Sequence, residues 1–178
     1  MLVNARESLV EERRRLGIDK HDERWEGEWH FVNPPNSWSP RLNGALLVVL
    51  GPLAVRAGLS PTAGAGVFAD LETDWRVPDQ VHARPDQEIE EGLIGAELVV
   101  EVRSPDDESY AKLPFYAARG VTEALIVHRA RRFELYRLDD DKTYQPVEDG
   151  RCSVLGVTFT TVEGPKLRIT RSDGSAEV

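Results

Sequence analysis

Two acidic residues and a lysine stand where the sequence predicts the ends of secondary-structure elements. Asp79 follows Val77-Pro78, and proline cannot donate to a sheet, so the carboxylate is placed at a strand end. Glu101 lies inside the apolar run ELVVEVRS, where alternation puts it on the face of Val99. Lys112 comes 112 − 101 = 11 residues later, at the start of a predicted helix. Carboxylates bind hard divalent cations and a lysine stabilises developing negative charge, so this trio suits metal-dependent phosphodiester hydrolysis. Structural salt bridges at strand ends would explain the same residues.

The elements that must position this trio are typical of an α/β domain. Apolar spacing predicts helices over residues 4–16 and 41–57, and a third helix that begins near Ser109–Tyr110 so that Pro114 lies in its first turn. Alternating and β-branched segments predict the strands, and RWEGEWHFV predicts a strand or hairpin. The segment SVLGVTFTTV is expected to end the sheet. The expected fold is a mixed β-sheet flanked by helices.

Three segments, VPDQV, ELVVEVRSPDDESYAKLPFYAARGVTEALIV and ELYR, carry a family resemblance. Together they resemble the Uma-type family of restriction endonucleases, a branch of the PD-(D/E)xK nuclease superfamily. The resemblance extends over roughly residues 23–165 and is most specific over 98–121. It implies the restriction-endonuclease fold and Mg²⁺- or Mn²⁺-dependent cleavage of DNA.

The resemblance assigns roles to individual residues. It implies that Asp79 and Glu101 are metal ligands, with the backbone carbonyl of Val102 as a third ligand. The superfamily lysine normally follows the glutamate by two positions, where this chain has Arg103, and a guanidinium cannot act as a base. The family resembles nucleases whose lysine has moved to the next helix, which points to Lys112 as the catalytic lysine.

Two features of the N-terminal third complete the comparison. The segment ERWEGEWHFVNPP resembles the family's E-x-x-x-G-E hairpin and marks Glu28 as a further acidic site residue. Relatives carry a histidine just before the helix at 41–57, where this chain has Ser39 or Pro40. Either that histidine is dispensable or this member is weakened or inactive.

Composition limits the remaining possibilities. The 178 residues are expected to form a single domain, with residues 1–22 as an N-terminal helical extension and 171–178 as a flexible tail. A single cysteine, Cys152, excludes an internal disulfide framework and a Cys-rich zinc site. The start of the chain has no apolar signal region and no stretch is long enough to span a membrane, so a cytoplasmic location is expected. The net charge of −9 argues against binding nucleic acid through bulk positive charge, and against an anionic membrane surface.

These observations leave two principal hypotheses. The first is a metal-dependent endonuclease acting on DNA as a homodimer, because restriction-type nucleases act on a two-fold duplex. The second is a catalytically inactive module that kept the nuclease fold and binds nucleic acid or protein. A carbohydrate-active enzyme with two carboxylates is a weaker third, because no aromatic-rich groove is indicated. Arg129, Arg131 and Arg132 form a basic cluster in a predicted hairpin turn, which is either solvated or in contact with phosphate.

Overall fold

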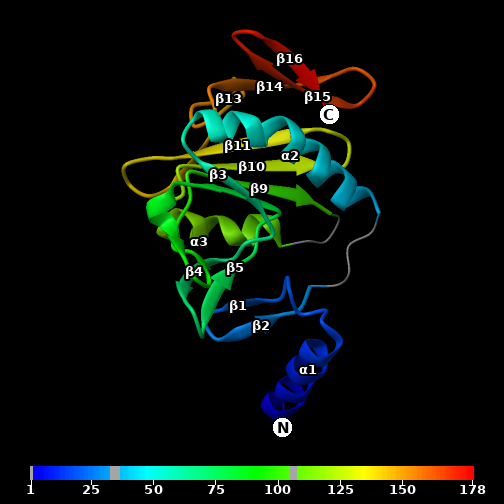
Figure 1. Cartoon of the computed structure of the whole chain (residues 1–178), viewed down its shortest axis with the longest axis vertical. Helices are drawn as coiled ribbons and strands as arrows, with labels where there is room; N and C mark the ends of the chain where they lie inside the picture. The colour runs from blue at the N-terminus through cyan, green and yellow to red at the C-terminus, as the bar shows by residue number, and fades with distance from the viewer. Residues whose placement is uncertain (1, 33–36, 105–107) are drawn as a thin grey trace.

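The computed structural model describes residues 2–32, 37–104 and 108–178. Its central layer is a six-stranded sheet in the order β12-β11-β10-β9-β6-β3 (Figure 1). From β3 to β12 in chain order, its strands are Ser60–Ala63, Gln80–Ala83, Leu98–Arg103, Glu123–His128, Phe133–Leu138 and Tyr144–Pro146. β9 and β10 run parallel and every other neighbouring pair is antiparallel. The expected mixed sheet is therefore confirmed, and β9, which carries Glu101, lies in its interior.

Two further sheets lie on either side of this central sheet in Figure 1. The lower sheet has the order β2-β1-β5-β4-β8-β7. In chain order, its strands are Glu23–Trp25, Glu28–His30, Val67–Asp70, Asp74–Arg76, Glu88–Ile89 and Gly92–Leu93. The C-terminal sheet has the order β13-β14-β15-β16 and is antiparallel throughout. Its strands are Arg151–Cys152, Val157–Val162, Lys166–Arg171 and Gly174–Glu177.

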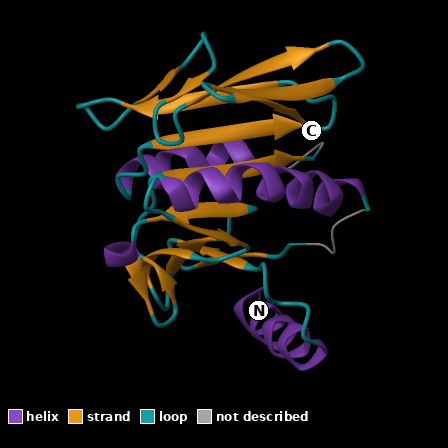
Figure 2. Cartoon of the chain, turned by 45° about the horizontal axis from the view of Figure 1, so that its top comes forward, coloured by secondary structure: helices purple, strands orange, loops and turns teal. Residues whose placement is uncertain are grey.

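The described residues also form three α-helices and two 3₁₀ turns (Figure 2). The helices are α1 (Leu2–Leu16), α2 (Trp38–Arg56) and α3 (Leu113–Ala118), and the 3₁₀ turns are Pro85–Gln87 and Ser109–Lys112. α2 begins three residues before the predicted start at 41, so Pro40 lies in its first turn, where an amide donor has no partner to lose. Pro114 occupies the same kind of position in α3, as expected. No helix among the described residues is long and apolar enough to cross a bilayer.

The alternation of β9 divides the core into two layers. Leu98, Val100 and Val102 point toward α2 and pack with the apolar side chains of that helix and of the C-terminal sheet. Val99 points the other way and packs with residues of α3 and the lower sheet. Because side chains on a strand alternate between faces, Glu101 shares the α3 face with Val99. A buried carboxylate is thus placed between the central sheet and α3.

The C-terminal segment differs from the sequence prediction. Residues 157–162 do not end the central sheet, and the expected flexible tail at 171–178 contains β16, which pairs with β15. The reason is burial, because Leu167 and Ile169 alternate along β15 into the core beneath α2. The polar residues of the predicted tail form the turn of this last hairpin and its outer strand, where alternation is hard to detect.

A fully buried glutamate, Glu123, joins the C-terminal sheet to the central sheet. It is the first residue of β10, and its carboxylate accepts hydrogen bonds from Cys152 Sγ (2.9 Å), the amide and hydroxyl of Ser153 (3.0 and 2.8 Å) and the Val154 amide (3.1 Å). Arg137 pairs with the same carboxylate at 2.8 Å. These hydrogen bonds lower the pKa of Glu123 although burial alone would raise it. The residue is a structural anchor.

Candidate active site

Asp79 lies beside Glu101 because β6 and β9 are antiparallel neighbours. Gln80 pairs with Val100, so the residue before β6 is directly opposite Glu101. The amide of Val102 donates to Asp79 Oδ2 at 2.7 Å. The Asp79 carbonyl in turn accepts from the side chain of Asn43 on α2, at 3.2 Å. The carboxylate of Asp79 is therefore oriented by the strand that carries Glu101.

Lys112 reaches the same place from the last residue of the second 3₁₀ turn. Its Nζ is 3.2 Å from Glu101 Oε1 and 2.7 Å from Glu23 Oε1. The lysine side chain is only 12% exposed, so little solvent screens these ion pairs. Arg103, the alternative for the lysine position of the motif, stacks over the ring of Tyr110 at 5.0 Å. Lys112 forms an ion pair with Glu101, as expected for a lysine that has moved to the next helix.

Glu23 is a site residue that sequence reasoning missed. Besides Lys112, its carboxylate accepts from the Val77 amide (2.8 Å) and from Trp25 Nε1 (2.7 Å), and the residue is 2% exposed. Glu28, which the motif had marked, is exposed on β2 at the end of the hairpin next to the turn. A signal was present, because Glu23 is the first glutamate of the same E-x-x-x-G-E motif. The hairpin thus contributes an acidic residue, but the buried one is Glu23.

The electrostatics of the site are dominated by burial. Burial raises the pKa of Glu101, Lys112 partly offsets the rise, and the negative charges of Asp79 and Glu23 add to it, so the pKa reaches about 8. Burial alone would lower the pKa of Lys112, but Glu101 and Glu23 raise it above its ordinary value. The ammonium therefore stays charged at neutral pH, and ionisation of Glu101 is disfavoured by its burial.

Tyr116 completes the surroundings of Glu101. Its hydroxyl donates to Glu101 Oε1 at 2.6 Å from α3, and the residue is fully buried. Burial and the nearby Glu101 and Glu23 carboxylates raise the pKa of the phenol well above its ordinary value, so it remains a hydrogen-bond donor. One oxygen of Glu101 thus receives both Tyr116 and Lys112.

Comparison with known proteins identifies the family. The family model of Uma2, described as "putative restriction endonuclease", matches residues 10–161. The chain belongs to the Uma2 family. The resemblance stated from the motifs is confirmed, and the family's description supports a nuclease.

A solved structure has a similar fold. The crystal structure of a protein described as a putative nuclease of DUF820, from Anabaena variabilis, matches this Uma2 protein with a TM-score of 0.58 and 14% sequence identity. The match covers 74% of this chain and 78% of that chain. At this identity the likeness establishes the fold. No curated protein matches the sequence.

The donor set of the Uma2 site fits a hard divalent cation. All of its candidate ligands are oxygens, and the carboxylates of Glu23, Asp79 and Glu101 outnumber the single ammonium of Lys112. Among the described residues, no three Asp, Glu, His or Cys side chains are already arranged around a common metal position. The ligand set that the family resemblance implies, Asp79, Glu101 and the Val102 carbonyl, stays a prediction.

Proposed function

We propose that this Uma2 protein is a Mg²⁺- or Mn²⁺-dependent endonuclease that hydrolyses phosphodiester bonds in DNA. The observation that carries the proposal is the contact of Lys112 with Glu101, opposite Asp79, at the junction of β6, β9 and the turn before α3. A purely structural ion pair would need only one carboxylate for the lysine. Here burial, together with the charges of Asp79 and Glu23, raises the pKa of Glu101 to about 8, and a divalent cation would offset this negative charge.

Each residue of the site has a distinct part in this proposal. A bound divalent cation would activate water and offset the charge of the phosphate. Asp79 and Glu101 would hold the cation, and the amide of Val102 fixes the orientation of Asp79. Lys112 would donate to an oxygen of the reacting phosphate. Glu23 keeps Lys112 charged and holds its Nζ, because its own oxygens are fixed by Val77 and Trp25.

A catalytically inactive nuclease-fold module is the second candidate. Two observations favour it: the net charge of −9, which opposes DNA binding, and the hydrogen bonds that already occupy Oε1 of Glu101. In this case Lys112 would serve as the permanent counter-ion of the buried carboxylates. The module would bind its partner without any dependence on divalent metal.

Cleavage of supercoiled plasmid with Mg²⁺, Mn²⁺ or EDTA separates these candidates. The endonuclease hypothesis expects nicking only with the metal, and loss of nicking in Asp79→Asn. Glu28→Gln is the matched control, because it removes a carboxylate from the exposed hairpin of the same motif and should cleave normally. Wild-type protein that binds Mn²⁺ in calorimetry but never nicks DNA would support the inactive module instead.

A further inference from the structure

The turn between β10 and β11 presents a cluster of arginines with no acidic partner. Arg129 and Arg132 are exposed and Arg131 is partly exposed. Among the described residues none of the three forms an ion pair, although the chain has 31 acidic residues against 22 basic ones. Because acidic residues are in excess, surface arginines of this protein are expected to form ion pairs with carboxylates. Their absence leaves a local positive charge that an external anion can use.

The conformation of this turn is well determined by its hydrogen bonds. The His128 amide donates to the Arg132 carbonyl and the Arg131 amide to the His128 carbonyl, both at 2.8 Å. Arg131 has a φ of 62°, and its carbonyl accepts from Thr161 Oγ1 of the C-terminal sheet at 3.1 Å. The guanidinium of Arg129 lies over the ring of Trp38, at 5.6 Å, at the start of α2. A rigid turn loses little conformational entropy on binding.

The turn lies at the same end of the central sheet as the candidate active site. In the parallel pair of β9 and β10, Ile126 is opposite Glu101 and His128 is opposite Arg103. The turn begins two to four residues further along the strands than Glu101 and one strand across from it. Strand geometry therefore puts the turn on the order of 10–15 Å from Glu101. Phosphates on one strand of a nucleic acid that reaches Glu101 would therefore pass within reach of the arginines.

The side chains between the turn and the site are already satisfied, so they do not compete for the arginines. Glu134 on β11 accepts from the hydroxyls of Tyr110 and Tyr136, each at 2.6 Å, and contacts Nε2 of His128 at 2.7 Å. Burial alone would raise the pKa of Glu134, but these three contacts lower it. Tyr110 belongs to the 3₁₀ turn that carries Lys112. Glu134 thus connects His128, the residue before the basic turn, to the 3₁₀ turn that carries Lys112.

We propose that residues 129–132 bind the phosphate backbone of a nucleic acid and guide the strand toward Asp79 and Glu101. This inference rests on the proposed nuclease function for its ligand. Arginine is the side chain best suited to phosphate oxygens. Since these contacts are made to the backbone, they contribute affinity and register without selecting a base sequence.

The test is DNA binding measured without catalysis. Fluorescence anisotropy in EDTA would follow a labelled DNA duplex and the corresponding single strand as KCl rises from about 50 to about 300 mM. The triple variant Arg129→Gln, Arg131→Asn, Arg132→Gln removes the three charges, and asparagine tolerates the positive φ at position 131. We expect at least about tenfold weaker binding at low salt, and a log–log salt slope reduced by about 2–3, since each lost phosphate contact removes about 0.9.

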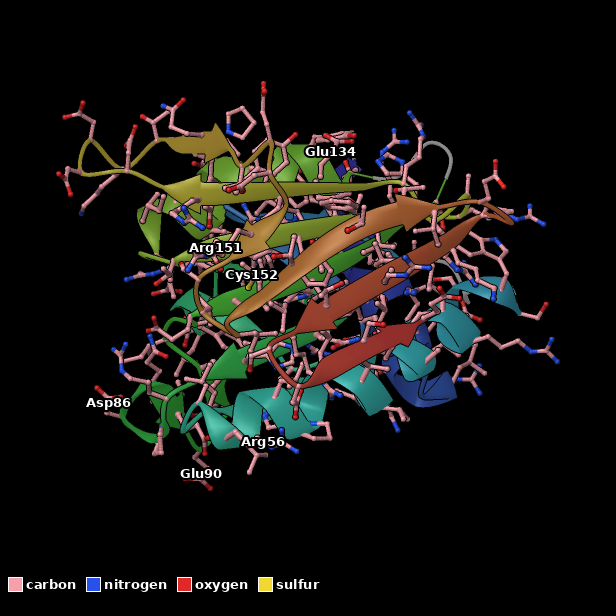
Figure 3. The ribbon with its side chains drawn as sticks, turned by 90° about the horizontal axis from the view of Figure 1, so that it is seen from above. Arg56, Asp86, Glu90, Glu134, Arg151 and Cys152 are labelled. Atoms are coloured by element: carbon pink, nitrogen blue, oxygen red, sulfur yellow. The ribbon has the colours of Figure 1, made fainter. Side chains whose placement is uncertain are left out.

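The matched control removes the same charge elsewhere. In the triple variant Arg15→Gln, Arg56→Gln, Arg151→Gln, all three sites are exposed. Arg56, on α2, lies at the opposite edge of the view from Glu134 in Figure 3. We expect this control to bind DNA nearly as wild type does. Equal weakening in both triple variants would mean that only net charge matters, and would overturn the inference.

The remaining outcomes separate this inference from the proposed function. A basic-turn variant that binds and cleaves like wild type overturns the inference and leaves the endonuclease proposal standing. Wild-type protein that binds DNA through the turn but never cleaves it supports the inference and argues for an inactive module. Equal binding to polyglutamate and DNA would show a surface for acidic polypeptide and overturn the assignment to nucleic acid.

Discussion

The raised pKa of Glu101 predicts an unusual pH dependence of stability for the metal-free protein. The folded-state pKa is about 8, whereas the ordinary value is 4.5. The unfolded chain therefore releases this proton at lower pH than the folded protein, and stability falls as pH rises between these two values. Integrating the linkage gives a loss of about 2–3 kcal/mol between about pH 5 and about pH 7, and about 5 kcal/mol in full by about pH 9.

Glu101→Gln isolates this contribution. The amide is similar in shape to the protonated acid and does not titrate, so the variant should lose this part of the pH dependence. Urea unfolding in EDTA, followed by far-UV circular dichroism at several pH values, gives the difference in free energy of unfolding between wild type and variant. Titrating groups distant from Glu101 contribute equally to both proteins and cancel in that difference, whereas Asp79, Glu23 and Lys112, which interact with Glu101, contribute to it. A wild-type stability curve that stays parallel to that of Glu101→Gln would refute the reasoning.

The same unfolding experiment can be repeated with Mg²⁺ in place of EDTA. A divalent cation binds the ionised form of Glu101, so stabilisation by Mg²⁺ should increase with pH up to about 8 and then level off. In Glu101→Gln the stabilisation should be weak and independent of pH. Glu28→Gln, an exposed position, should follow wild type both in EDTA and in Mg²⁺.

Three other predictions test separate parts of the structure. Lys112→Met removes the ammonium 3.2 Å from Glu101, so it should abolish most nicking activity yet bind Mn²⁺ at least as tightly as wild type in calorimetry. His82 is fully buried and burial lowers its pKa from 6.5 to about 4, so stability should fall as pH drops between those values. Wild type should therefore lose about 2 kcal/mol of stability between neutral pH and about pH 5 in urea unfolding, and His82→Leu should not show this loss. Light scattering at micromolar concentration should give the mass of a homodimer, and a monomer throughout would contradict that expectation.

The sequence predicted the centre of the structure better than its edges. The apolar run around Glu101 identified an interior strand, and alternation put this carboxylate on the face of Val99, which in the structure is the face away from α2. The placement of Asp79 opposite Glu101 depends on an antiparallel pairing, which local patterns do not encode but the family motif implies. Glu23 could not be chosen over Glu28 because β1 and β2 have three residues each, too few for alternation to indicate the buried face.

The anchoring of Glu123 makes the C-terminal sheet part of the folding unit that contains the site. Detaching that sheet would break the hydrogen bonds that Cys152 and Ser153 donate to the Glu123 carboxylate, which has no exposed surface. Glu123 is the first residue of β10, the strand that pairs with β9. Detachment would leave Arg137 as the protein partner of this carboxylate and would also expose Leu167 and Ile169, so partial opening is disfavoured relative to global unfolding. Amides of β14 and β15 should then exchange with deuterium as slowly as those of β9 and β10. A substitution near residue 160 would affect the candidate active site through this shared cooperativity, without touching any residue in it.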